Sequence, residues 1–207
     1  MADNGNQINR TISEDRITNT IYHYKLLSYD GLGGSECIVS DIIRPKILSK
    51  LFHNHEMLIN YYRSRGVKIG TGCLICTDLS SNDSVLLDIG NDVVISTDVK
   101  FVLHDFSISR CIKGKSNLFG KIKIGNNSFI GSGSVLLYGV ELGNNVIVAA
   151  GSVVTKSFRE ENIILGGNPA HVIGSWDAFR KKYETNATNV GEFIEDAIKN
   201  PHMLVKR

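Results

Sequence analysis

From Leu118 to Val154 an aliphatic residue recurs at every sixth position of the chain, and a small or β-branched residue stands four positions after most of them. The same phase occurs in two earlier blocks, one running from Ile89 to Phe101 and a shorter one beginning at Ile69. A period of six matches neither the 3.6-residue period of a helix nor the simple alternation of a strand. It predicts a short strand followed by a corner, repeated, with the aliphatic side chain always directed inward. The recurring positions are aliphatic except for the aromatic Phe101: Ile69, Ile75, Ile89, Ile95, Phe101, Leu118, Ile124, Ile130, Leu136, Leu142, Val148 and Val154.

Gly, Asn and Asp cluster directly after these aliphatic positions, as in Gly90-Asn91-Asp92, Gly125-Asn126-Asn127 and Gly143-Asn144-Asn145. These residue types tolerate the backbone conformations that a tight corner needs. Three such hexads close one triangular coil, and successive coils stack about 4.8 Å apart through parallel ladders. Each coil contacts only its neighbours, so the two ends need caps. The pattern therefore predicts a β-helix but leaves its handedness open, since parallel crossovers are nearly always right-handed.

The flanks of the repeat predict caps and a tail, which divides the chain into residues 1–66, 67–173 and 174–207. Residues 1–20 are polar and Asn-rich, as in a loose tail. Residues 42–65 carry apolar side chains at helical spacing, with Pro45 in the first turn and Gly66 as the stop, so they predict a helix over the first coil. Residues 175–183 and 189–200 predict two further helices after the repeat. The predicted apolar face of the first helix is formed by Ile43, Ile47, Leu51, Leu58 and Tyr62.

Composition excludes several partners and sites. Among the 207 residues, 23 Lys and Arg face 21 Asp and Glu, and this near-balance argues against nucleic acid as a partner. No run of about 20 apolar residues and no signal-peptide pattern occurs, so we expect a cytoplasmic protein without a membrane span. Of four cysteines, Cys73 and Cys76 form a C-x-x-C pair, but a zinc ribbon needs a second pair. Cys73 falls on an inward position, so we expect a packed thiol and no metal.

The six-residue phase is lost between Phe101 and Leu118, so residues 107–117 must loop out of the coil. His104 stands just before this loop, and no other histidine lies between Val67 and Phe158. Histidine has a pKa near neutrality, so it suits a group that takes up a proton and later returns it. His104 is therefore the first candidate for chemistry.

The stretch IGNNSFIGSGSVLLYGVELGNNVIVAAGSVVTKSF, which begins at Ile124, and the later GGNPAHVI resemble the hexapeptide-repeat acyltransferases, in particular the sugar O-acetyltransferases of capsule and lipopolysaccharide clusters. The resemblance runs from about Val67 to Ile173. It implies a left-handed parallel β-helix and transfer of acetyl from acetyl-coenzyme A to a sugar hydroxyl, in capsular or surface polysaccharide biosynthesis. It also implies a homotrimer with its active sites at the subunit interfaces.

The resemblance assigns the general base to His104, because relatives place a histidine beside the same excursion. Asp105 follows it and either orients the imidazole or holds a corner of the backbone. We expect Asp83 or Asn82, in the irregular segment between two blocks, to reach the acceptor across a subunit boundary. Arg110, in the excursion, and Phe129, where relatives carry an aromatic, are further candidates for contact with the acceptor.

For coenzyme A, the resemblance indicates small residues at Ser132 and Ala150, along which the pantetheine arm can lie. Thr155 and Lys156 follow, and the lysine suits a phosphate as a point charge. Two positions depart from the family pattern, because His171 and Gly174 stand where relatives carry Lys or Arg. The departure leaves the contacts at the nucleotide end of the coenzyme open.

Three alternatives remain. A carbonic anhydrase on the same β-helix needs three imidazoles on one zinc, and the repeat supplies only His104. A non-catalytic scaffold is the second alternative. The third is transfer to a different small acceptor, such as serine, an antibiotic or the nitrogen of an amino sugar.

Overall fold

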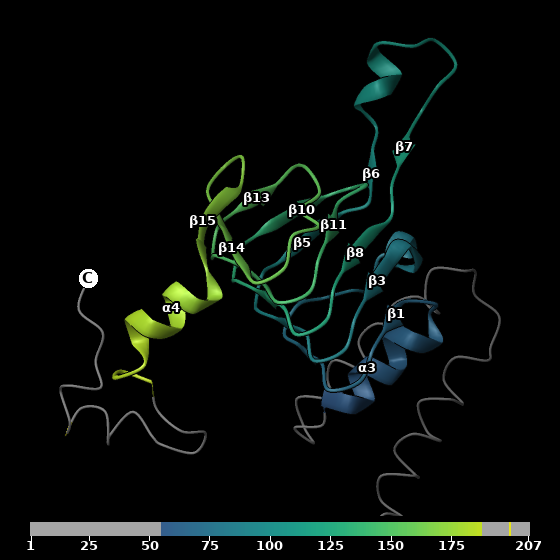
Figure 1. Ribbon diagram of the computed structural model, residues 1–207. Helices are drawn as coiled ribbons and strands as arrows, with labels where there is room; N and C mark the ends of the chain where they lie inside the picture. The colour runs from purple at the N-terminus through teal and green to yellow at the C-terminus, as the bar shows by residue number, and fades with distance from the viewer. Residues whose placement is uncertain (1–54, 188–198, 200–207) are drawn as a thin grey trace, which may run out of the picture. The chain divides into compact units, whose positions relative to one another are not determined.

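The computed structural model describes residues 55–187 and residue 199. The predicted tail, most of the predicted helix over 189–200 and the first part of the predicted helix over 42–65 lie outside the described residues. Three sheets of short parallel strands enclose one hydrophobic interior (Figure 1). Sheet A contains β1 (Lys68–Ile69), β3 (Leu87–Ile89), β8 (Ile122–Ile124) and β11 (Glu141–Leu142). Sheet B contains β2 (Leu74–Ile75), β4 (Val94–Ile95), β9 (Phe129–Ile130), β12 (Val146–Val148) and β14 (Ile163–Gly166), and sheet C contains β5 (Lys100–Val102), β10 (Val135–Leu137) and β13 (Val153–Val154).

The register of these sheets confirms the repeat. Ile124 lies beside Leu142, Ile130 beside Val148 and Leu136 beside Val154, so one coil takes three hexads. Each inward aliphatic side chain therefore stacks on its counterpart in the next coil, away from water. Burying an aliphatic side chain of this size stabilises the fold by about 1.5–3 kcal/mol. The fully or almost fully buried positions include Ile95, Ile122, Ile130, Leu136, Val146, Val148, Val154 and Leu165.

Leu118 corrects the predicted repeat, because its side chain is 40% exposed and lies outside the coils. It belongs to β7 (Leu118–Phe119), which pairs antiparallel with β6 (His104–Asp105) in a projecting hairpin. The hairpin carries the 3-10 turn η2 (Ser107–Arg110) near its outer end (Figure 1). The excursion from the coil is thus residues 104–119, longer at both ends than the predicted 107–117, and we call it the arm. The Gly120 amide donates to the Leu103 carbonyl at 3.1 Å and closes the base of the arm.

The sequence predicts the helices that flank both ends of the solenoid, but not the return strand at its far end. Helix α3 (His55–Ser64) buries Ile59 and Tyr62 against the first coil, and the turn that follows it contains Gly66, whose φ is +91°. The face predicted for this helix lacked Ile59. At the other end, β15 (His171–Ser175) returns antiparallel along β14 and leads into α4 (Trp176–Tyr183). In the described part of the chain, no helix is long and apolar enough to cross a membrane.

Asparagine side chains join the coils at one corner. Asn127, Asn145 and Asn162 all adopt a left-handed backbone conformation, with φ between 52° and 59°. The Asn127 Nδ2 donates to Asn145 Oδ1 at 2.8 Å, and the Asn145 Nδ2 donates to Asn162 Oδ1 at 2.9 Å. Asn tolerates this backbone region better than other residues with a side chain. Each residue therefore both forms the turn and hydrogen-bonds to the next coil, and we call this row of side chains the ladder.

Asn145→Ala should lower the free energy of unfolding by about 2 kcal/mol, because it removes two hydrogen bonds and places a Cβ-bearing aliphatic residue at positive φ. Asn145→Gly is the matched control, since it removes the same bonds while tolerating the backbone conformation. We expect the glycine variant to be the less destabilised of the two in chemical denaturation. Equal stability of both variants and the parent would rule out the ladder as a stabilising element.

Candidate active site

Two insertions leave the solenoid at the same corner, and this places the candidate catalytic residues. The 3-10 turn η1 (Asn82–Leu86) directly precedes β3, and the arm precedes β8. Strands β3 and β8 are neighbours in sheet A, with Leu87 beside Ile122. The insertions before them therefore lie one above the other, where sheet C passes into sheet A. We call this edge the C–A corner.

At this corner the His104 Nδ1 lies 2.5 Å from the Asp83 Oδ2. A carboxylate accepts only, so in the neutral imidazole the proton lies on Nδ1 and Nε2 carries the lone pair of a base. The imidazole side chain is 49% exposed, which leaves it open to a reactant. Asp83 is held in turn, because its backbone amide donates to the Ser81 Oγ at 3.3 Å.

Phe119 lies beside the imidazole from across the hairpin. It is the strand partner of His104, and the two ring centroids are 5.8 Å apart. Its side chain is 60% exposed although it is aromatic and lies next to the candidate base. The sequence does not single out Phe119 as a site residue. The one available indication was that an aromatic residue stands just before the repeat resumes.

Asp105 holds the backbone at the base of the arm. Its Oδ1 accepts from the Ser107 amide at 2.7 Å and its Oδ2 accepts from the Tyr138 hydroxyl at 3.2 Å. The Ser107 bonds, then that of Tyr138, lower the pKa of Asp105, while desolvation and then the Asp105 charge raise the pKa of Tyr138. The charged carboxylate is the favoured form, so this anchor persists above the ordinary pKa of aspartate and is lost as pH falls through the lowered value.

The two carboxylates therefore have different contacts. Of the two roles expected for Asp105, orienting the imidazole or holding a corner of the backbone, its contacts match the second. The carboxylate that bonds the imidazole is that of Asp83. Within one chain Asp83 contacts His104, and the expected contact of Asp83 with the acceptor across a subunit boundary stays a prediction.

The expected coenzyme residues occupy two different edges. Ser132 and Ala150 lie between sheets B and C, which we call the B–C corner; both are exposed, and the Gly151 amide donates to the Ser132 carbonyl at 2.9 Å. The Ser132 Oγ lies 2.6 Å from the Ser96 Oγ of the preceding coil. A Cβ on Gly131 would come within 2.5 Å of the Ala150 nitrogen, so only glycine permits this close stacking.

Thr155 and Lys156 follow β13 and so lie at the C–A corner, two coils beyond the arm. Both side chains are exposed, and the Lys156 Nζ lies 5.4 Å from the centre of the Phe158 ring. Since coils are spaced about 4.8 Å apart, the lysine stands roughly 10 Å along the axis from His104. His104 and Lys156 share one edge, whereas Ser132 and Ala150 lie across sheet C from them.

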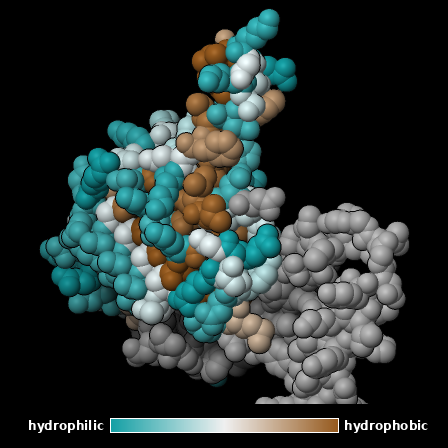
Figure 2. Space-filling view, turned by 90° about the vertical axis from the view of Figure 1, so that its right-hand side faces the viewer, coloured by the Kyte–Doolittle hydropathy of each residue, from teal (hydrophilic) through white to brown (hydrophobic). Residues whose placement is uncertain are grey.

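The remaining candidates for contact with the acceptor lie away from the His104–Asp83 pair within one chain. Phe129 begins β9, so it lies on sheet B, and its side chain is exposed. Arg110 ends η2, which stands away from the coils on the arm (Figure 1). Hydrophobic side chains run along the arm and continue onto the body at its base (Figure 2), and the exposed ones of the arm are Phe106, Ile112, Leu118 and Phe119.

The cysteines of the described region behave as separate thiols. Cys73 packs against the core, its Sγ donates to the Gly90 carbonyl at 3.1 Å, and burial raises the pKa of this thiol. This confirms the prediction for Cys73, while Cys76 is exposed. Within residues 55–187 and 199, no three His, Cys, Asp or Glu side chains come together as a metal site.

Comparison with known proteins agrees with this architecture. A family model described as the hexapeptide repeat of succinyl-transferase matches residues 121–156, which begin just after the arm. Protein CapG of Staphylococcus aureus is 46% identical over 130 residues, which are 60% of this chain and 75% of that protein. A Dictyostelium discoideum protein named as an acetyltransferase is 47% identical over 88 residues, 42% of this chain and 46% of its own.

The crystal structure of a hexapeptide-repeat-containing acetyltransferase from Vibrio cholerae has the same fold. It superposes with a TM-score of 0.52 at 20% identity, over 68% of this chain and 91% of its own. The predicted left-handed β-helix is thereby confirmed. The fold, the repeat and the extent of the similarity to CapG lead to one conclusion: the chain belongs to the hexapeptide-repeat acetyltransferase family.

Proposed function

We propose that this protein transfers the acetyl group of acetyl-coenzyme A to a hydroxyl of a sugar, in the biosynthesis of a capsular or surface polysaccharide. The observation that carries the proposal is the pair formed by His104 and Asp83 at an edge that also carries Lys156. The choice of a sugar hydroxyl follows the resemblance of the repeat to sugar O-acetyltransferases.

The reaction needs a base and no protein nucleophile. The His104 Nε2 takes the proton of the acceptor hydroxyl as its oxygen attacks the thioester carbonyl. The carbon–sulfur bond then breaks, and the imidazolium returns the proton to the departing thiolate. Asp83 keeps the imidazole in the correct tautomer and stabilises the imidazolium that forms between the two steps.

The coenzyme is assigned to the small residues and the lysine of the later coils. Ser132 and Ala150 are exposed and lack bulk, so the pantetheine arm can approach the backbone there. Thr155 and Lys156 lie at the C–A corner, where the lysine supplies a positive charge for a phosphate. These residues fit an extended, phosphate-bearing ligand that enters along the solenoid axis and ends at His104.

We infer that the complete site forms between two chains of a homotrimer. Ser132 and Ala150 lie at the B–C corner, and His104 and Lys156 lie at the C–A corner, so a single chain presents the two sets on different edges. Packing the C–A corner of one chain against the B–C corner of a neighbour unites them. The same packing covers the apolar side chains of the arm and brings Phe129 and Arg110 to the acceptor side of the seam.

His104→Ala should lower turnover by about 10²–10⁴-fold, the usual contribution of a general base, with coenzyme A affinity nearly unchanged. Lys156→Ala should do the opposite, weakening coenzyme binding with only a modest loss of turnover at saturation. Release of the coenzyme thiol measures the first quantity, and equilibrium titration measures the second. His55→Ala, which removes an exposed histidine of α3, is the matched control. Near-native turnover of His104→Ala would remove this residue from the mechanism.

Asp83→Asn and Asp105→Asn distinguish the two carboxylates beside the base. Loss of the group that orients the imidazole should lower kcat by about 10–10³-fold for Asp83→Asn. Asp105→Asn retains an acceptor for the Ser107 amide and should stay within about tenfold of the parent. We expect faster hydrogen exchange of the Ser107 amide in the second variant alone. A larger loss of kcat in Asp105→Asn than in Asp83→Asn would contradict the assignment.

Mixing two inactive variants tests the shared site. His104→Ala disables the C–A corner, and Ser132→Trp blocks the B–C corner, so each variant alone should be nearly inactive. Refolded together in equal amounts, about a quarter of the seams in a closed ring receive both intact corners, and activity should return to that extent. Sedimentation should show the mass of three chains in every sample. Absence of complementation, or a stable and active monomer, would overturn the shared site.

A further inference from the structure

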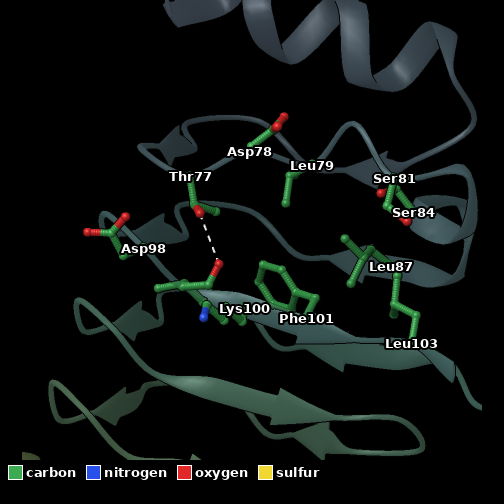
Figure 3. A pocket seen from close by; sticks show the side chains of 11 residues that line it. Thr77, Asp78, Leu79, Ser81, Ser84, Leu87, Asp98, Lys100, Phe101 and Leu103 are labelled. Carbon is green, nitrogen blue, oxygen red and sulfur yellow. Dashed lines mark hydrogen bonds between the residues drawn. The ribbon is translucent and has the colours of Figure 1, made fainter. Parts of the chain in front are cut away.

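The first coil lacks a strand on its third side. Sheet C has the strand order β13-β10-β5, so β5 lies at its edge, whereas sheets A and B continue for one strand more in the same direction. The segment that begins at Thr77 stands where the missing strand would lie. It approaches β5 through the Thr77 hydroxyl, which donates to the Val99 carbonyl at 2.9 Å. The gap is a pocket of about 350 Å³ that opens into the interior of the coil (Figure 3).

The partial exposure of Phe101 shows that the pocket interrupts the hydrophobic core. It occupies the inward position of the repeat and pairs with Leu136 of the next coil. Leu136 is fully buried, but Phe101 is only half-buried, because its ring faces the pocket instead of another coil. Figure 3 shows the ring between the two segments that form the walls. Leu79, Leu87, Val99 and Leu103 also line the pocket, and because all four are buried they form its floor.

One end of the pocket adjoins the catalytic pair. Ser81 and Ser84 both line it, and Asp83 lies between them in the chain. Leu103 also lines it, and His104 is the next residue. Successive Cα atoms are about 3.8 Å apart, so the backbones of Asp83 and His104 both lie next to this end of the pocket. Asp98 lies at the other end of the pocket (Figure 3).

The position of the pocket indicates which substrate it takes. The residues assigned to coenzyme A lie on the coils beyond His104, and the pocket lies on the coil before it. The two substrates must approach the base from opposite sides, so this pocket belongs to the acceptor. Its accessible apolar surface is the Phe101 ring above a floor of buried aliphatic side chains, and Ser81 supplies an exposed hydroxyl at the reactive end.

We propose that the first-coil pocket binds the neutral pyranose ring that carries the reacting hydroxyl, with the apolar face of the ring against Phe101. A pyranose combines a C–H face with hydroxyls around its edge, which matches apolar walls and a polar end. The pocket includes two aspartates, Asp78 and Asp98, and one lysine, Lys100, so it disfavours an anionic ring. This inference rests on the proposed acetyl transfer and adds the place and class of the acceptor.

Phe101→Leu tests the pocket, because leucine suits the repeat but lacks the flat ring. We expect a rise of about tenfold in the KM for the acceptor, with kcat, the KM for acetyl-coenzyme A and its slow hydrolysis by water nearly unchanged. Phe179→Leu, the same substitution on α4, is the matched control. The acceptors are methyl glucoside, methyl galactoside and methyl N-acetylglucosaminide, and glucuronic acid is the anionic comparison.

Saturation-transfer difference NMR with the same four compounds gives a readout independent of turnover. The neutral glycosides should show transfer to their ring C–H protons in the parent, which Phe101→Leu weakens and Phe179→Leu leaves unchanged. Equal acceptor KM values in the two variants, binding of glucuronic acid in preference to the neutral rings, or no binding by any pyranose would each overturn the pocket assignment. The proposed function fails separately, if hydrolysis of acetyl-coenzyme A does not depend on His104.

Discussion

The stacking of each inward aliphatic side chain on its counterpart one coil away is the interaction on which the structure depends. Because the strands have only two to five residues, no single ladder is stable alone, and stability comes from neighbouring coils that share one register. That register requires every coil to return to the same position after three hexads. Extra residues must therefore leave at a corner, where they interrupt no ladder.

This constraint brings His104 and Asp83 together although 21 positions separate them. The turn η1 and the arm are both insertions before a strand of sheet A, so the solenoid aligns the two segments although no strand of one pairs with a strand of the other. Beside them, the missing strand under β5 leaves part of the core uncovered. The same irregular first coil thus supplies the partner of the imidazole and the pocket next to it, while the regular later coils carry the small exposed residues.

The fold was predictable because the six-residue repeat gives a periodic signal. The candidate site lies on the two insertions outside the repeat, where no such signal exists. The sequence predicts the coil, the corner residues, Gly66 and the helix after Ser175, each through local chemistry. It misplaces Leu118, because an aliphatic residue in the correct phase can equally belong to a hairpin. It also offers only the adjacent Asp105 as a possible partner of His104 and does not indicate Asp83 for that role, since the loop conformation that turns Asp105 toward Ser107 and Tyr138 has no periodic signature.

Arg63 has a consequence for how far the solenoid can extend. Its guanidinium donates to the carbonyls of Ile69 and Gly70 at 3.0 and 2.6 Å, and Glu56 and Asn60 of the same helix hold it in place. These carbonyls belong to the outermost coil, whose edge otherwise offers a template for another strand. A stack of identical coils has no intrinsic length, so a single arginine on a short helix helps to make this one a discrete molecule and not the seed of a fibre.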